Sequence, residues 1–187
     1  MSKVVLASGS PRRQEMMKRF GIDFICKSPD IQENLNKDLA VEDAVIALAK
    51  EKALAIYKKY SDSLVIGFDT IVVLDDEIMG KPKNLDEAMN MLTRLSGNTH
   101  RVITGCAFFD TVEEITFYSD AYVTFSEMTQ DEIEDYVMHN DVLDKAGAYA
   151  IQDDAAKYIE HIKGDYYAVI GFPINKIYQT LKNKNCL

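Results

Sequence analysis

Val4-Val5-Leu6-Ala7-Ser8-Gly9-Ser10-Pro11-Arg12-Arg13 is the stretch of this chain that decides its fold. An apolar run, small polar residues and a proline predict a strand, a tight loop and a helix, with Ser10 as N-cap and Pro11 at the first helical position. Helix N-termini attract anions, Gly9 lets the backbone approach a ligand closely, and the two arginines fit phosphate oxygens. The pattern has two interpretations: a phosphate-binding loop, or an ordinary strand-to-helix turn with solvated arginines.

The composition indicates a folded protein of one domain or two closely packed lobes, because 47% of the 187 residues are hydrophobic. A net charge of -9 argues against binding to nucleic acid or to an anionic membrane, since those surfaces need a basic excess. The three cysteines lack the spacing of a zinc site and the even number of a disulfide framework. The sequence shows neither a signal peptide nor an apolar run long enough to span a membrane. We therefore expect a cytoplasmic protein with no nucleic-acid or membrane partner.

Apolar periodicity and turn residues predict an α/β chain. The predicted strands are 23–27, 64–68 with a continuation at 71–74, 99–110 and 114–125, and the predicted helices after the first are 41–60, 85–95, 129–139 and 173–181. The polar segment 28–38 is interpreted as a surface loop or a lid. No repeat or linker divides the chain, so we expect a single α/β domain over residues 1–187, with a long hairpin.

Three charged residues stand out against their surroundings. Lys52 falls within the apolar stripe of the 41–60 helix, where it either snorkels to solvent or meets an anion. Asp69 closes an apolar strand, at the carboxyl end where open α/β sheets collect ligands, and a buried charge there is costly unless it is paired or bound to metal. Glu33 lies in the polar loop, as a solvated or a functional carboxylate.

Together the charged candidates form a set that suits phosphate chemistry. They are the cations Arg12, Arg13, Lys52 and Lys81 and the carboxylates Glu33 and Asp69, with Asp30 as a further carboxylate. Cations neutralise phosphate oxygens, while carboxylates hold a hard divalent metal and can deprotonate water. Hydrolysis at phosphorus needs no covalent nucleophile. The absence of a serine or cysteine nucleophile motif therefore agrees with this chemistry.

The chain resembles the Maf family in a series of sequence blocks that runs nearly end to end. The blocks are 8–13, the loop around Glu33, 49–53, 68–70, 80–82, 144–152, 164–166 and 171–173. Their order and spacing make the resemblance specific. It implies an elongated, ITPase-like α/β fold in which a mixed β-sheet is flanked by helices and the site lies in a cleft between two lobes. It also implies a homodimer.

The resemblance further implies a metal-dependent nucleoside triphosphate pyrophosphatase, which cleaves between the α and β phosphates and uses Mg²⁺, Mn²⁺ or Co²⁺. Asp69 would be the general base or a metal-associated carboxylate, and Glu33 a metal or water partner. The residues implied for catalysis are Asp69, Glu33, Lys52 and Lys81, and those implied for substrate binding are Ser8, Arg12, Arg13, Thr70 and Gln152.

The substrate implied by the resemblance depends on three positions. Arg12, Thr70 and Gln152 match the branch of the family that acts on dTTP and UTP, rather than the branch that acts on 7-methyl-GTP. A threonine and a glutamine amide can supply the donors and acceptors of a pyrimidine edge. Three alternatives stay open: a 7-methyl-GTP pyrophosphatase, an enzyme for modified pyrimidine nucleotides, and a nucleotide-binding regulator of cell division and septum formation with little or no hydrolysis.

Overall fold

The computed structural model describes residues 3–36 and 38–187 and has an α/β architecture. Its strands are β1 (Val4–Ala7), β2 (Phe24–Lys27), β3 (Leu64–Leu74), β4 (Glu77–Met79), β5 (Thr99–Phe109), β6 (Glu114–Phe125) and β7 (Ile159–Gly164). Its helices are α1 (Pro11–Arg19), α2 (Val41–Tyr57), α3 (Leu85–Leu95), α4 (Gln130–His139), α5 (Tyr166–Ile170) and α6 (Ile174–Asn183), with the short 3-10 helices η1 (Ala146–Ala148) and η2 (Asp154–Tyr158). Lys37, which belongs to the predicted polar loop, lies outside the described residues.

Within the described residues the strands form one seven-stranded mixed sheet, in the order β2-β1-β3-β5-β6-β7 with β4 paired to β3. Strand β1 pairs in parallel with β2 and β3, whereas β4 and β7 pair in antiparallel fashion with β3 and β6. The predicted α/β class, a mixed sheet flanked by helices, is confirmed. Of the helices in residues 3–36 and 38–187, none has the length and apolar character needed to span a membrane.

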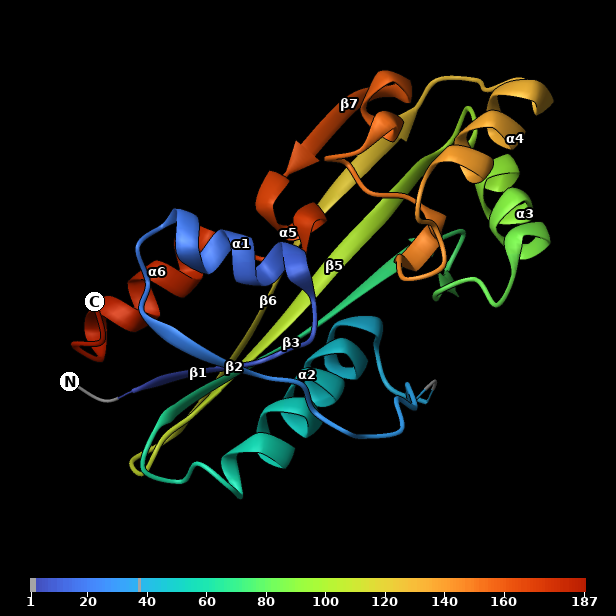
Figure 1. Ribbon diagram of the computed structural model, residues 1–187. Coiled ribbons are helices and arrows are strands. Elements are labelled where there is room, and N and C mark those ends of the chain that lie inside the picture. Colours follow the sequence, from blue (N-terminus) through green and yellow to red (C-terminus); the bar gives the residue numbers. More distant parts are fainter. Residues whose placement is uncertain (1–2, 37) are drawn as a thin grey trace. The chain divides into compact units, whose positions relative to one another are not determined.

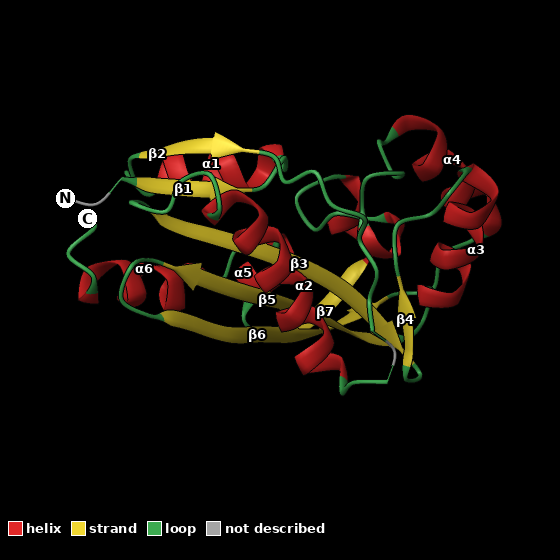
Figure 2. Ribbon diagram, turned by 90° about the horizontal axis from the view of Figure 1, so that it is seen from below, coloured by secondary structure: helices red, strands yellow, loops and turns green. Residues whose placement is uncertain are grey.

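The chain divides into two compact units. Unit 1 comprises the N-terminal part up to Asp69 together with 104–119 and 171–187, and unit 2 comprises 70–103 and 120–170. In unit 1, helices α1 and α2 lie on opposite sides of the strands (Figures 1 and 2). The cleft between two lobes that the resemblance implies stays a prediction.

Helix α2 packs very closely on the strands of unit 1. A Cβ added to Gly67 of β3 would lie 2.4 Å from the Ala49 carbonyl oxygen, and one added to Gly105 of β5 would lie 2.6 Å from the Val45 carbonyl oxygen. Ala49 and Ala53 of α2 belong to the same buried cluster as Val65 of β3. Because both surfaces carry small residues, the helix backbone approaches the sheet closely, and Lys52, between these alanines, is carried into the interior.

Unit 2 has its own apolar core. Residues of β3 and β4 pack there with one face of α3 and with α4, and Leu92 and Leu95 of α3 are completely buried. Both helices are capped at their starts: the Asn84 side chain accepts a hydrogen bond from the Glu87 amide at α3, and Thr129 and Glu132 form a full capping box at α4. The predicted bounds of α3, Leu85–Leu95, are confirmed.

The helix predicted over 41–60 is shorter in the structure, Val41–Tyr57. Two further predictions, both close to the candidate site, also differ from the structure. Ser10 is the N-cap residue of α1, but its side chain makes no capping hydrogen bond, and its own amide donates to Ser8 Oγ at 3.2 Å. Strand β3 does not end at Asp69: it continues to Leu74, because Val72 and Leu74 are buried in the core of unit 2. The predicted strand and its continuation are therefore one strand, and Asp69 lies inside it.

Candidate active site

The loop after β1 is held by the hydroxyl of Ser8, which is buried with 4% of its surface exposed. Its Oγ accepts hydrogen bonds from the Ser10 amide at 3.2 Å and from Arg13 Nη1 at 3.3 Å. On the opposite side of the backbone, Cys26 Sγ of β2 donates to the Ser8 carbonyl oxygen at 3.0 Å. The loop that the sequence predicts as a phosphate-binding loop is thus fixed by a helix residue and by a strand residue of unit 1.

Arg13 is the arginine that points into unit 1. Its Nε donates to the Gly171 carbonyl oxygen at 2.9 Å, and its guanidinium carbon lies 5.3 Å from the centre of the Phe68 ring. Phe68 stacks in turn on Phe172, with ring centres 5.5 Å apart. Burial lowers the pKa of Arg13, an effect that the nearby Asp69 opposes, and the guanidinium keeps its charge at neutral pH. Arg13 is therefore a pre-oriented cation beside a carboxylate.

Lys52 joins the two carboxylates that the sequence predicts as functional. Its Nζ lies 2.7 Å from Asp69 Oδ1 and 2.9 Å from Glu33 Oε1. Lys52 and Asp69 are buried, with 7% and 6% of their surfaces exposed, whereas the Glu33 side chain is 43% exposed. Of the two interpretations of Lys52, snorkelling to solvent is wrong, because the ammonium meets anions in the interior.

Asp69 lies in β3, just beyond the end of the pairing of β3 with β1. The parallel pairing of β1 with β3 ends at Ala7 and Gly67, so that Asp69 lies two residues beyond the carboxyl end of the paired β1. Asp69 therefore lies beside the carboxyl end of β1, where ligands collect in open α/β sheets, and not at the carboxyl end of its own strand β3. Burial raises the pKa of Asp69 above its ordinary value, although Lys52 and Arg13 oppose this shift. A carboxylate with a raised pKa is a better proton acceptor near neutral pH.

The structure brings five predicted residues of unit 1 into one cluster, which we call the Lys52 cluster: Ser8, Arg13, Glu33, Lys52 and Asp69. Arg12 follows Pro11 in α1, and its charge lowers the pKa of Arg13. Thr70, Lys81 and Gln152 belong to unit 2. Thr70 is half-buried directly after Asp69, whereas Lys81 and Gln152 are exposed. Their part in a common site stays a prediction.

The Lys52 cluster has the oxygen ligands that a divalent cation such as Mg²⁺ takes from proteins. Magnesium is commonly held by one or two carboxylates, with the remaining ligands supplied by substrate phosphates and water. Glu33 and Asp69 provide two carboxylates that already share one cationic partner, Lys52 Nζ. No group of three or more His, Cys, Asp or Glu side chains in residues 3–36 and 38–187 is placed to hold a metal ion. The two carboxylates fit the part of a magnesium coordination shell that a protein commonly supplies.

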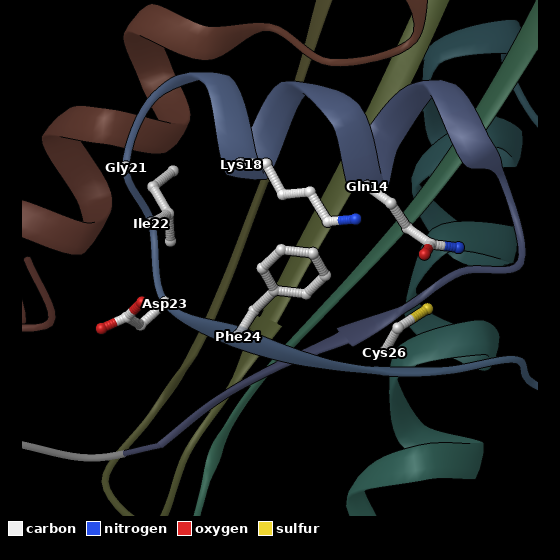
Figure 3. A pocket seen from close by; sticks show the side chains of 7 residues that line it. All are labelled: Gln14, Lys18, Gly21, Ile22, Asp23, Phe24 and Cys26. Carbon is white, nitrogen blue, oxygen red and sulfur yellow. The ribbon is translucent and has the colours of Figure 1, made fainter.

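A cavity of about 510 Å³ lies elsewhere in unit 1, between α1 and β2. Figure 3 shows its lining side chains, with Lys18 of α1 above the ring of Phe24 and Cys26 beside Gln14. No residue of the Lys52 cluster lines it. Because phosphate hydrolysis needs several cations and carboxylates that converge, we place the chemistry at the Lys52 cluster and not in this cavity.

Two partners of Arg13 were not predicted as functional from the sequence. The Gly171 carbonyl accepts its Nε hydrogen bond, and a backbone carbonyl leaves no signal in a sequence beyond the 171–173 block itself. Phe68 is completely buried beneath the guanidinium. The sequence signal for a functional role of Phe68 is its position directly before Asp69. A buried strand, however, also explains an apolar residue at this position without any functional role.

The fold is similar to that of a solved structure, that of the Staphylococcus aureus Ham1 protein. The TM-score is 0.54 and the sequence identity 13%, and the match covers 97% of this chain and 99% of that chain. At this identity the likeness shows the fold alone. The class of protein is thus an α/β protein with a mixed seven-stranded sheet of the Ham1 kind.

The sequence comparisons identify the family. A model described as "Maf-like protein" matches residues 3–184. Proteins of Bacillus anthracis and Bacillus cereus, each named dTTP/UTP pyrophosphatase, are 43% identical over 185 residues, which cover 99% of this chain and 97% of each relative. A protein of Bacillus cytotoxicus with the same name is 43% identical over 182 residues, covering 97% of this chain and 95% of the relative. This chain belongs to the Maf family.

Proposed function

We propose that this protein is a metal-dependent nucleoside triphosphate pyrophosphatase that hydrolyses dTTP and UTP to the nucleoside monophosphate and pyrophosphate. The observation that carries the proposal is the Lys52 cluster, in which a buried ammonium lies 2.7 Å from Asp69 and 2.9 Å from Glu33. The names of the relatives, which are 43% identical over nearly the whole chain, support the reaction and the substrates.

In this proposal Asp69 is the general base that takes a proton from the attacking water. Its burial favours the protonated form, so that the carboxylate gains from accepting a proton, while Lys52 and Arg13 keep it ionisable. Lys52 has three donor hydrogens and can contact a phosphate oxygen while it orients the two carboxylates. The charges of Lys52 and Arg13 thus influence both the position and the pKa of the Asp69 carboxylate.

The positive charges neutralise the triphosphate. Arg13 is held by Gly171 and Ser8, so little side-chain entropy is lost when its fork meets a phosphate. Lys81 is proposed as a further phosphate ligand from unit 2. Glu33 and Asp69 would hold Mg²⁺, Mn²⁺ or Co²⁺, and such a cation supplies positive charge that stabilises the phosphate oxygens in the transition state. Without a cation, two carboxylates would repel the triphosphate.

Base recognition is assigned to Arg12, Thr70 and Gln152. A hydroxyl and an amide can each donate and accept a hydrogen bond, which suits the edge of thymine or uracil. A methylated purine carries a positive charge and favours an aromatic stacking partner instead. We include a homodimer and a cytoplasmic location in the proposal, both as the family resemblance and the composition lead us to expect.

The test is a substrate panel with a matched variant. Pyrophosphate release is measured with dTTP, UTP, CTP and 7-methyl-GTP in the presence of Mg²⁺, Mn²⁺ or Co²⁺. We expect dTTP and UTP to be preferred and Asp69→Asn to lower kcat by about 10²–10⁴-fold. The control is Asp76→Asn, in an exposed turn with φ 62°, a conformation that asparagine accepts.

Each contrary outcome points to a different conclusion. Equal activity of Asp69→Asn and the wild type would remove Asp69 from the role of base. Faster turnover of 7-methyl-GTP than of dTTP and UTP would assign the chain to the other branch. Binding of nucleotides without any hydrolysis would favour the nucleotide-binding regulator of cell division.

A further inference from the structure

Lys145 is a buried lysine of unit 2 that the proposed mechanism does not use. Only 6% of its surface is exposed. Its Nζ donates hydrogen bonds to the Asp141 carbonyl oxygen and to Asp144 Oδ1, the latter at 2.8 Å, and Asp153 Oδ2 lies 3.8 Å away, at ion-pair distance. A buried ammonium is costly unless it is compensated, so these three oxygens determine where the side chain can lie.

The two carboxylate partners of Lys145 lie at the two ends of one loop. Asp144 begins and Asp153 ends the segment 144–153, which contains η1 and the turn after it. Gln152, assigned above to the base, directly precedes Asp153. The turn that carries Gln152 is closed by a hydrogen bond from the Asp153 amide to the Ala150 carbonyl, at 3.1 Å. The ion pair of Lys145 with Asp153 is therefore made at the residue next to Gln152, within the turn from which the Gln152 side chain extends.

The middle of the same loop is attached to the segment that carries Lys81. The Gly147 amide donates to the Gly80 carbonyl oxygen at 3.1 Å, and Gly80 directly precedes Lys81. Gly147 has φ 68°, and a Cβ at this position would lie 3.1 Å from Val72 Cγ2, so the loop packs against β3 without room for a side chain. The Ala148 amide closes the turn on the Lys145 carbonyl at 3.1 Å.

From these contacts we propose that Lys145 is a positioning residue that sets base selectivity: its ammonium ties the ends of the 144–153 loop and thereby holds Gln152 and Lys81 in one arrangement. Lys145 acts through the loop and touches no substrate. The inference rests on the proposed function, because it takes Gln152 and Lys81 to be substrate ligands. A loosened loop should weaken nucleotide binding and the choice of base, whereas the proton transfer assigned to Asp69 should change much less.

The main variant is Lys145→Met, which keeps an unbranched side chain and removes the ammonium group, and Lys145→Arg restores a positive charge. The control is Lys163→Met, an exposed lysine of β7 in the same unit. We expect Lys145→Met to raise KM for dTTP about tenfold and to lower the preference for dTTP over CTP by a similar factor, with kcat within about threefold of wild type. Lys145→Arg should recover part of both losses, and Lys163→Met should behave as wild type.

Hydrogen exchange gives a readout that does not need activity. The Gly147 amide donates to the Gly80 carbonyl and the Asp153 amide to the Ala150 carbonyl, and both amides should exchange about tenfold faster in Lys145→Met than in wild type. If the wild type hydrolyses no nucleotide, the proposed function fails, while faster exchange would still show that Lys145 orders the loop. Unchanged exchange would overturn the inference whatever the activity.

Two further outcomes decide the inference where the exchange result alone does not. Unchanged KM and base preference in a folded Lys145→Met protein would show that the lysine is only structural. If Lys145→Met does not fold, Asp153→Asn takes its place, because this side chain is 32% exposed and its loss is tolerable. A smaller change in the same direction would support the inference, and wild-type selectivity in Asp153→Asn would overturn it.

Discussion

Replacing Lys52 with methionine should make the stability of the protein strongly dependent on pH. At the 2.7 Å between Lys52 Nζ and Asp69 Oδ1, two unit charges attract each other by about 6 kcal/mol gross at an effective dielectric constant of about 20. Desolvation of both groups offsets much of this energy, but removal of one partner of a buried pair leaves the other uncompensated, at a cost of about 3–5 kcal/mol. We therefore expect Lys52→Met to lose about 3 kcal/mol of unfolding free energy at pH 8.

The sign of the pH dependence follows from Asp69. Its pKa in the folded protein is raised by burial, and the loss of Lys52 raises it further. The folded state then binds more protons than the unfolded state, so that stability is greatest below the ordinary pKa of aspartate and falls as the pH rises through the folded pKa. The deficit of Lys52→Met against wild type should shrink as the pH is lowered, because protonation of Asp69 removes its uncompensated buried charge.

Urea unfolding followed by far-UV circular dichroism between pH ~5 and pH ~8 measures this difference. The matched control is Lys50→Met on the same helix, because Lys50 forms a half-exposed ion pair with Glu114 that should contribute less than about 1 kcal/mol. In the enzymatic assay, the acid limb of kcat/KM should move to higher pH in Lys52→Met, since the base must ionise before it accepts a proton. A small, pH-independent deficit like that of Lys50→Met, with an unmoved acid limb, would refute the reasoning.

Two further predictions follow from buried rings. Burial lowers the pKa of His100 to about 4, and its Nε2 lies 2.6 Å from the Tyr149 hydroxyl. Because the histidine of the unfolded state takes up a proton near pH 6.5, the unfolding free energy of the wild type should fall by up to about 3 kcal/mol from pH ~6.5 to pH ~4. In urea titrations, His100→Gln should lack this contribution to the pH dependence of stability. Phe68→Leu removes the ring beneath Arg13 and should raise KM for dTTP about 3–10-fold, whereas Phe117→Leu should leave KM unchanged; equal effects of the two substitutions would count against a role of the stacking.

Local signals in the sequence predict much of the fold. Helix α3 spans the predicted residues, Leu85–Leu95, and α4, predicted over 129–139, spans Gln130–His139 with a Thr129–Glu132 capping box at its start. Such features depend on residues within one turn of each other. The extension of β3 beyond Asp69 depends instead on Val72 and Leu74, which are buried in the core of unit 2 among residues distant in the chain, so the local pattern does not show that the strand continues through a polar residue.

The residues of the candidate site also differ in whether a local sequence signal predicts them. Lys52 is a candidate site residue in the sequence because the helical period defines an apolar face, and a charged residue on that face is unexpected. Glu33 lies in a loop without any period, and its contact with Lys52 joins residues 19 positions apart. The residues by themselves offer Glu33 as a candidate but do not distinguish a solvated loop glutamate from a functional one, and only the family resemblance gives it a role.

Lys145 shows what a sequence leaves open even when a motif is recognised. It lies within the 144–152 block, yet its surroundings in the chain predict neither burial nor a partner. Its burial depends on Asp153, eight residues along the chain, and on the Asp141 carbonyl, a group that every residue type possesses. A helix period can reveal a lysine that faces the core, as it did for Lys52. In an aperiodic loop, only the folded structure can reveal a lysine that faces the core. The burial of Lys145, and the proposed positioning of Gln152 that depends on it, are therefore inferred from contacts in the structure and not from a sequence pattern.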